Sequence, residues 1–170
     1  MTATDLELVG RARNGDSAAF GSLVRRHYDA AFAVALARVG SREDAEDACQ
    51  DAFITALQRL DECRQPERFR AWVLQIVRNR AHNVRRHQSL RSGPPLDRAG
   101  LLHDPGQNPA RDAERAELRG RLSEAMRTLT PTQREVLLLH DAEGLRHREI
   151  ASALGISQAS SRVHLHKARR

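Results

Sequence analysis

Apolar residues recur every three or four positions along most of the chain, which is the period of an α-helix with one buried face. No segment alternates apolar and polar residues over a useful length, so the pattern predicts an all-α fold. Four apolar stripes precede residue 92: Leu6, Val9 and Ala12; Phe20, Leu23, Val24, Tyr28, Ala31, Phe32 and Ala35; Ala45, Ala48, Cys49, Ala52, Phe53, Ala56, Leu57 and Leu60; Phe69, Trp72, Val73, Ile76, Val77, Ala81 and Val84.

Residues that favour helix starts support these boundaries. The second helix can begin at Asp16 or Ser17, and the third at Ser41, because such side chains accept hydrogen bonds from the first free backbone amides. Glu43 and Asp44 follow in the first turn of the third helix, where the helix dipole favours negative charge.

Four more helices are expected after residue 111. A polar helix spans about residues 112–127 and is expected to turn four side chains inward: Leu118, Leu122, Ala125 and Met126. Residues 130–133 (TPTQ) form a capping box with proline at the first helical position, which opens a helix that ends near Gly144. Two further helices are predicted over residues 146–154 and 157–170.

Glycine and proline concentrate between the two helical halves, at residues 92–95 (SGPP) and 104–109 (DPGQNP). The intervening stretch keeps no helical period and is longer than most connections inside a compact domain. We therefore predict two small helical domains, at residues 1–91 and 112–170, joined by a flexible linker at 92–111.

The last two predicted helices have the features of a helix-turn-helix. Ala151 is small enough for a second helix to cross closely above it, and Gly155 can adopt the left-handed backbone that the turn favours. Ile150, Leu154, Ile156 and Leu165 would hold the two helices together. Ser157 then opens a helix with hydrogen-bonding and basic side chains, as a major-groove reader needs. An ordinary helical hairpin with a solvated face is the alternative.

Charge is polarised along the first domain. Residues 41–62 carry seven acidic side chains and two arginines, whereas residues 63–91 carry eight arginines and one glutamate. Single charge runs usually mark solvated faces, but adjacent faces of opposite sign indicate two partners, a basic protein surface and a nucleic acid. The net charge of +6 agrees with a polyanionic partner. Lys167 is the only lysine, a bias that phosphate binding and a GC-rich genome explain equally well.

The sequence excludes several other classes of protein. It has no apolar run of 18 residues and no secretory signal, so we expect a cytoplasmic protein without membrane insertion. Cys49 and Cys63 are too few for a disulfide framework or a zinc site; Cys49 is expected in the core, and Cys63, near a helix end, could be exposed. Phosphate loops, nucleophile elbows and paired catalytic carboxylates are missing, so we expect no enzyme activity and no cofactor.

Aromatic and histidine side chains could suggest other sites. Phe69, Trp72 and Tyr28 are potential stacking platforms for bases, but their place on apolar stripes favours core packing. His164 and His166 lie two residues apart and so face different sides of a helix, which argues against a shared metal.

Four segments, in this order, resemble the extracytoplasmic-function branch of the bacterial sigma factors. They are residues 44–53 (DAEDACQDAF), 69–79 (FRAWVLQIVRN), 129–136 (LTPTQREV), and 149–151 (EIA) with 165–169 (LHKAR). Each piece is moderately specific, whereas the four together are highly specific and cover nearly the whole chain.

The resemblance implies a sigma factor that binds core RNA polymerase and promoter DNA and that an anti-sigma factor could regulate. The implied polymerase-binding residues are Asp44, Asp47, Gln50, Asp51 and Phe53. The implied minus-ten residues, within and after the segment 61–83, are Arg64, Arg70, Arg78, Asn79, His82, Asn83, Arg85 and Arg86. The implied minus-thirty-five residues are Ser157, Gln158, Ser160, Ser161, Arg162, His164 and Lys167.

Two positions depart from the family pattern. His82-Asn83 stands where the family often has Ile-Asp, so the minus-ten contacts cannot be copied across. Ser161 stands where an apolar residue usually anchors the recognition helix, a loss that Val163 could offset.

Two other classes of protein compete with the sigma interpretation. Helix-turn-helix tails also end transcriptional regulators that never bind polymerase, but these usually carry an α/β sensory domain, which the four helical stripes argue against. A helical adaptor that binds only protein leaves the recognition helix unexplained.

Overall fold

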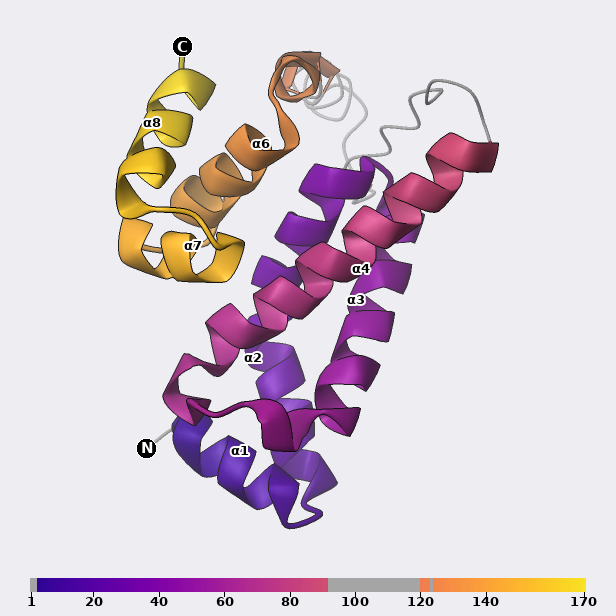
Figure 1. Cartoon of the computed structure of the whole chain (residues 1–170), viewed down its shortest axis with the longest axis vertical. Coiled ribbons are helices and arrows are strands. Elements are labelled where there is room, and N and C mark those ends of the chain that lie inside the picture. Colours follow the sequence, from indigo (N-terminus) through magenta and orange to yellow (C-terminus); the bar gives the residue numbers. More distant parts are fainter. Residues whose placement is uncertain (1–2, 92–119, 123) are drawn as a thin grey trace, which may run out of the picture.

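The computed structural model describes residues 3–91, 120–122 and 124–170, with side chains described for all of these except residues 88–91. Two helical domains and no strand are found within these ranges, which confirms the all-α expectation (Figure 1). The N-terminal domain comprises α1 (Asp5–Arg13), α2 (Ser17–Val39), α3 (Arg42–Gln58) and α4 (Phe69–Arg91), with 3-10 turns η1 (Leu60–Glu62) and η2 (Pro66–Arg68) before α4. The C-terminal domain comprises α6 (Pro131–Leu137), the π-helical turn η3 (Leu138–Ala142), α7 (His147–Leu154) and α8 (Gln158–Ala168). The expected linker at 92–111 lies outside the described residues.

Side-chain caps begin most of these helices where the sequence predicts them. Asp16 accepts a hydrogen bond from the Ala19 amide, and Ser41 accepts one from Asp44. The Thr130 hydroxyl and the Gln133 side chain form the predicted reciprocal capping box. These interactions satisfy amides that the helix itself leaves unpaired, so they define helix starts from local sequence alone.

The N-terminal core lies where α2, α3 and α4 pack against one another. Its largest buried side chains include Leu23, Val34, Phe69, Val73 and Leu74. Most residues of the four stripes are buried as expected. Leu6 and Leu57 are exposed and Tyr28 is about one third exposed, because these residues lie at the edges of their stripes. The core also includes Leu74 and Val34, which the stripes missed.

The C-terminal core is built from the helices that follow Leu129. Val136, Leu139, Ile150 and Leu154 are fully buried, together with most of Leu165. Residues 120–122 and 124–128 are helical, but Leu122 and Ala125 are exposed and Met126 is only half-buried. The expectation that four side chains face inward is therefore wrong for Leu122 and Ala125, which take no part in the core cluster, and the fourth residue, Leu118, lies outside the described residues.

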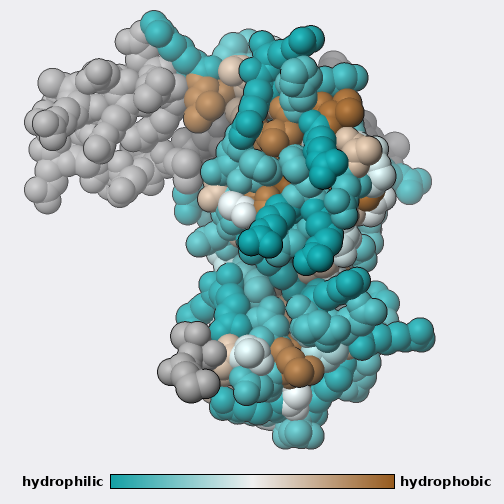
Figure 2. Space-filling view, turned by 90° about the vertical axis from the view of Figure 1, so that its left-hand side faces the viewer, coloured by the Kyte–Doolittle hydropathy of each residue, from teal (hydrophilic) through white to brown (hydrophobic). Residues whose placement is uncertain are grey.

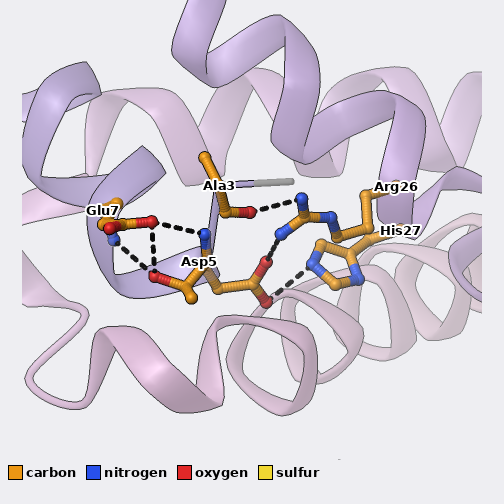
Figure 3. Close-up of polar contacts among 6 residues, drawn as sticks. Ala3, Asp5, Glu7, Arg26 and His27 are labelled. Carbon is orange, nitrogen blue, oxygen red and sulfur yellow. Dashed lines mark hydrogen bonds and ion pairs between the residues drawn. The ribbon is translucent and has the colours of Figure 1, made fainter. Parts of the chain in front are cut away.

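A partly buried polar cluster joins α1 to α2 (Figure 3). The Asp5 carboxylate accepts a hydrogen bond from Arg26 Nη1 at 2.6 Å and contacts His27 Nε2 at 2.9 Å. His27 is buried against Phe69, with the ring centroids 5.6 Å apart. Burial opposes ionisation of Asp5, but the contacts with His27 and Arg26 outweigh it and lower the pKa of this carboxyl below its ordinary value of 3.8.

We expect Asp5→Asn to destabilise the N-terminal domain by about 1–2 kcal/mol at pH 7, because an amide loses the charge-assisted bonds to both partners. The lowered pKa means that the native contribution is present above pH 3.8 and disappears as the pH falls through the folded-state pKa. Urea unfolding at pH 7 and near pH 3 measures the difference. Asp29→Asn, on the exposed side of α2, is the control. An equal difference at both pH values would contradict the assignment.

Candidate nucleic-acid and polymerase interfaces

The helix-turn-helix forms as the sequence predicts. Gly155 adopts a left-handed backbone (φ 64°) between α7 and α8, where a side chain would be strained. Ser157 caps α8 by accepting a hydrogen bond from the Ser160 amide at 3.0 Å. Ala151 and Leu165 are buried between the two helices. These contacts place α8 on the outer side of the C-terminal domain, away from α4 (Figure 1).

The structure divides the predicted α8 residues into two groups. Gln158, Arg162 and Lys167 are exposed, whereas Ser160 and His164 are half-buried beside the core. Ser157 is exposed, but its hydroxyl is engaged in the cap.

Ser161 does not face solvent, so the prediction that it contacts DNA is corrected. Its side chain is 0% exposed, and its hydroxyl lies 2.9 Å from His147 Nδ1. At this position, where an apolar residue was expected to anchor the recognition helix, a polar contact holds α8 to His147 instead. Val163 does not offset the loss by packing, because it is 50% exposed.

Three further residues of α8 are exposed and were not in the predicted DNA-contacting set: Ala159, Val163 and His166. A helical projection with Ser161 and Leu165 on the inner side would have identified them. Ala159 and Val163 lie two positions before and after Ser161, and His166 lies five positions after it, so all three point away from the core. The surface on this side of the molecule is largely hydrophilic with small hydrophobic patches (Figure 2).

The predicted minus-ten residues also separate into two groups. Asn79, His82, Asn83, Arg85 and Arg86 are exposed, as is Arg64 in the loop before the helix. Arg70 and Arg78 are half-buried against the C-terminal domain, where Arg78 Nη1 donates to the Leu154 carbonyl at 2.5 Å.

A groove lies beside the predicted acidic surface of α3. Asp47, Gln50 and Asp51 are exposed, and Asp44 is half-buried with its carboxylate bonded to the Ser41 hydroxyl. Phe53 is buried and reaches the surface only as part of the groove. The groove has a volume of about 480 Å³ and is lined by Phe20, Val24, Tyr28, Glu46, Gln50, Phe53, Ile54 and Leu57.

Ile54 and Leu57 are about half exposed and were not predicted as functional residues. They lie on the same side of α3 as Gln50, so this helix presents apolar side chains next to carboxylates. We call this the α3 docking face, defined by Asp47, Gln50, Asp51, Ile54 and Leu57.

Both thiols are shielded. Cys49 and Cys63 are both buried, so the expectation that Cys63 could be exposed is wrong. The Cys63 side chain is covered because η1 and the following loop fold back on α1. Burial raises the pKa of Cys49 to about 12 and also raises that of Cys63. Neither thiol is therefore a ready nucleophile.

The rings of His140 and His147 lie with their centroids 5.0 Å apart and their planes tilted by 33°. Throughout the described parts of the chain, no three histidine, cysteine or acidic side chains gather in a way that could hold a metal ion. None of the helices described is long and apolar enough to cross a membrane.

A helix-turn-helix joined to a helical domain with acidic and basic faces is the architecture of a two-domain DNA-binding protein. Comparison with family models makes this specific: residues 23–91 match sigma-70 region 2, and residues 119–170 match sigma-70 region 4. The chain belongs to the sigma-70 family, in its extracytoplasmic-function branch.

Similar proteins cover the chain almost completely. It is 38% identical to the probable RNA polymerase sigma factor RfaY of Xanthomonas campestris pv. campestris, over 93% of this chain but only 40% of that protein. It is 32% identical to the RNA polymerase sigma factor NccH of Alcaligenes xylosoxydans xylosoxydans, over 98% of this chain and 91% of NccH.

Solved structures agree with this fold. CnrH in complex with the cytosolic domain of CnrY matches with a TM-score of 0.71 and 29% identity, over 97% of this chain and 92% of the CnrH chain. The sigma factor RpoE of Bartonella quintana, in complex with the anti-sigma factor NepR, matches with a TM-score of 0.69 and 21% identity, over 88% of this chain and 91% of that one. The latter likeness supports the fold alone.

Proposed function

We propose that the protein directs promoter-specific transcription initiation as a non-catalytic sigma subunit, binding core RNA polymerase and both promoter elements in the cytoplasm. The observation that carries this proposal is the presence in one chain of the α3 docking face and an exposed recognition helix. A regulator that binds only DNA needs α8 but has no use for apolar residues exposed beside carboxylates on α3.

The α3 docking face suits a basic and partly apolar protein surface. Its carboxylates can steer a basic partner, while the groove provides apolar area that remains exposed in the free protein. We assign this face to core polymerase, with Phe53 as the floor of the groove rather than a surface contact.

The basic residues of α4 suit an unpaired DNA strand. Arginines and amide side chains can contact the backbone and bases of a single strand, which is the state of the minus-ten element during opening. Asn79, His82, Asn83, Arg85 and Arg86 are exposed for such contacts, and Arg70 and Arg78 extend the basic surface along the helix.

The upstream, minus-thirty-five element is assigned to α8. Gln158, Arg162 and Lys167 are exposed donors for base edges and phosphates, and Ala159, Val163 and His166 occupy the middle of the same face. An anti-sigma factor is a further proposed partner, because the similar sigma factor CnrH was solved in complex with the cytosolic domain of CnrY, an anti-sigma factor.

Mixing the protein with core polymerase and transcribing a promoter library tests the whole proposal. Specific initiation that depends on the protein supports it. Failure to bind core would favour a polymerase-independent helix-turn-helix regulator, whereas core binding without initiation would favour an adaptor.

Asp51→Arg is expected to weaken core binding about tenfold or more, because it places a cation where the α3 docking face attracts a basic partner. The measurement is a titration of core polymerase by fluorescence anisotropy at two salt concentrations. Asp29→Arg makes the same charge change on α2 and outside the groove-lining residues, so it should bind normally. Equal loss in both variants would remove the α3 docking face from the proposal.

Arg162→Ala is expected to weaken binding of upstream duplex DNA by about tenfold, while core affinity stays unchanged. Ser161→Ala, one residue away but buried, should instead lower stability by about 1 kcal/mol through loss of the His147 contact and leave DNA affinity nearly intact. Electrophoretic mobility shifts and thermal unfolding separate the two effects. Reversed results would mean that α8 presents its other face to DNA.

Val163 is expected to contact a thymine methyl group in the upstream element, because it is an exposed apolar side chain at the centre of the α8 outward face. Replacing the contacted thymine by uracil, which removes only that methyl, should weaken binding by roughly threefold to fivefold. In Val163→Ala the same replacement should have little further effect. Uracil scanning of the selected duplex provides the measurement; full sensitivity to uracil in both proteins would assign the methyl contact elsewhere.

A further inference from the structure

One arginine at the end of α1 holds the loop between α3 and α4. This loop, residues 60–68, contains η1 and η2 and lies against α1 (Figure 1). Arg13 Nη2 donates to the Leu60 carbonyl at 3.0 Å and to the Cys63 carbonyl at 2.6 Å. Its Nε also donates to the Leu60 carbonyl, at 3.4 Å. One guanidinium therefore joins two loop carbonyls to a helix that comes 47 and 50 residues earlier in the chain.

The backbone hydrogen bonds within the loop are short-range. The amides of residues 62, 63 and 68 each bond to a carbonyl three residues earlier. Bonds of this kind close single turns but do not determine where the loop lies on the domain. Leu60, Cys63 and Phe69 are buried and anchor the loop to the core. The Arg13 bonds add direction to these apolar anchors, because a charged donor orients the carbonyl that accepts from it.

The helix that carries Arg13 is fixed at both ends. At its start, the Asp5 carboxylate is bonded to Arg26 of α2. At its end, Arg11 donates to Asp16, the residue that caps α2, at 2.6 Å and 2.9 Å. Arg13 therefore reaches the loop from a support that does not depend on the loop itself.

The bond to Cys63 bears directly on the residue that follows it. Because the peptide bond is planar, a donor that fixes the Cys63 carbonyl also fixes the orientation of the Arg64 amide. Arg64 and Gln65 are both exposed. Arg64 belongs to the predicted minus-ten set, and the Gln65 amide can both donate to and accept from a base edge. Arg13 thus holds the backbone immediately before two side chains that suit a nucleic acid.

The two carboxylates at the start of the loop lie beside cations. Glu62 accepts a hydrogen bond from Arg59 at 2.5 Å, which lowers the pKa of this carboxyl below its ordinary value. Asp61 lies 3.7 Å from Arg13 Nε. A single strand carries a negative charge at each phosphate and is repelled by carboxylates next to it. Arg13 and Arg59 reduce that repulsion at the loop.

We propose that Arg13 is a positioning residue for minus-ten recognition, which orders the loop so that Arg64 and Gln65 are already in place when the unpaired strand arrives. The inference rests on the proposed minus-ten role of α4 and of the loop before it, and it deepens that role. The loop leads directly into α4, and the start of α4 is about 20 Å from Asn83, so one strand can contact both. Arg13 itself does not touch the strand.

Order in the free loop has a consequence for binding. A loop that moves freely must lose conformational entropy when a strand binds, and this loss offsets part of its contacts. A loop held by Arg13 loses less. Its contacts therefore contribute more to affinity and to the preference for one base over another.

A double-substitution cycle tests whether Arg13 acts through Arg64. Arg13→Met keeps an apolar stem but removes every donor, and Arg64→Ala removes the proposed contact. The native chain, both single variants and the double variant are each assembled with core polymerase. A fluorescein-labelled non-template single strand is titrated into each holoenzyme. Its sequence spans the minus-ten element of a promoter recovered in the transcription assay.

Each single substitution should weaken strand binding about fivefold. The double variant should bind within twofold of Arg64→Ala, because residues that act through one contact are not additive. Probes with one base changed at a time give a second readout. Bases that lose discrimination in Arg64→Ala should also lose it in Arg13→Met, whereas a general loss of stability would weaken all probes equally.

Arg11→Met is the matched control. It removes the same charge from the same helix, but Arg11 bonds to Asp16 and not to the loop, so strand binding should stay within twofold of the native value. Arg13→Lys keeps a charged donor on a shorter side chain, so its base preference should fall between those of the native protein and Arg13→Met. Circular dichroism establishes whether each variant folds, and Arg13→Lys takes the place of Arg13→Met in the cycle if the latter does not.

Three results would overturn the inference: losses that multiply in the double variant, unchanged strand binding in the Arg13 variants, or an equal loss in Arg11→Met. Full strand binding by Arg64→Ala would also overturn it, while the assignment of the minus-ten strand to α4 would survive. If the native holoenzyme forms but does not bind the single strand, the proposed minus-ten function itself fails, and the inference fails with it.

Discussion

The packing of α4 against α2 and α3 is the constraint on which the rest of the molecule depends. Phe69, Val73 and Val77 bury one side of the helix, and burial of such side chains is worth about 1.5–3 kcal/mol each. This buried seam determines where every other side of α4 points. The exposed basic residues face solvent, and Arg70 and Arg78 face the C-terminal domain. Rotation of α4 about its own axis would therefore disturb the core, the contact between the domains and the basic surface together.

The sequence predicted those parts of the fold that depend on neighbours a few residues away. The Asp16, Ser41, Thr130 and Ser157 caps and the left-handed Gly155 formed as expected, because their partners lie within four residues. Predictions at the edges of apolar stripes were less accurate. Leu57 is exposed although it keeps the stripe's spacing, since only the neighbouring helices determine how wide a buried seam is.

The candidate sites show the same difference between features set by near neighbours in the sequence and features set by distant ones. Exposed donors such as Gln158 and Arg162 could be predicted from the position of the cap, whereas Ser161 could not be placed until its partner His147, fourteen residues earlier, was known. Arg38 of α2 donates a hydrogen bond to Glu135 of α6, 97 residues away, and no local pattern connects them. In sequence, Glu135 is one more polar residue of a short helix. Only the packed structure shows that it is fully buried between two arginines.

The polar character of the contact between the domains has a physical consequence. Apolar side chains of similar size would hold the domains as firmly or more firmly, since a buried ion pair gains little over its desolvation cost. They would, however, offer nothing that a nucleic acid could replace. A carboxylate on arginines is an interaction that a phosphate can exchange for directly, because the cations need not lose a partner when the domains part.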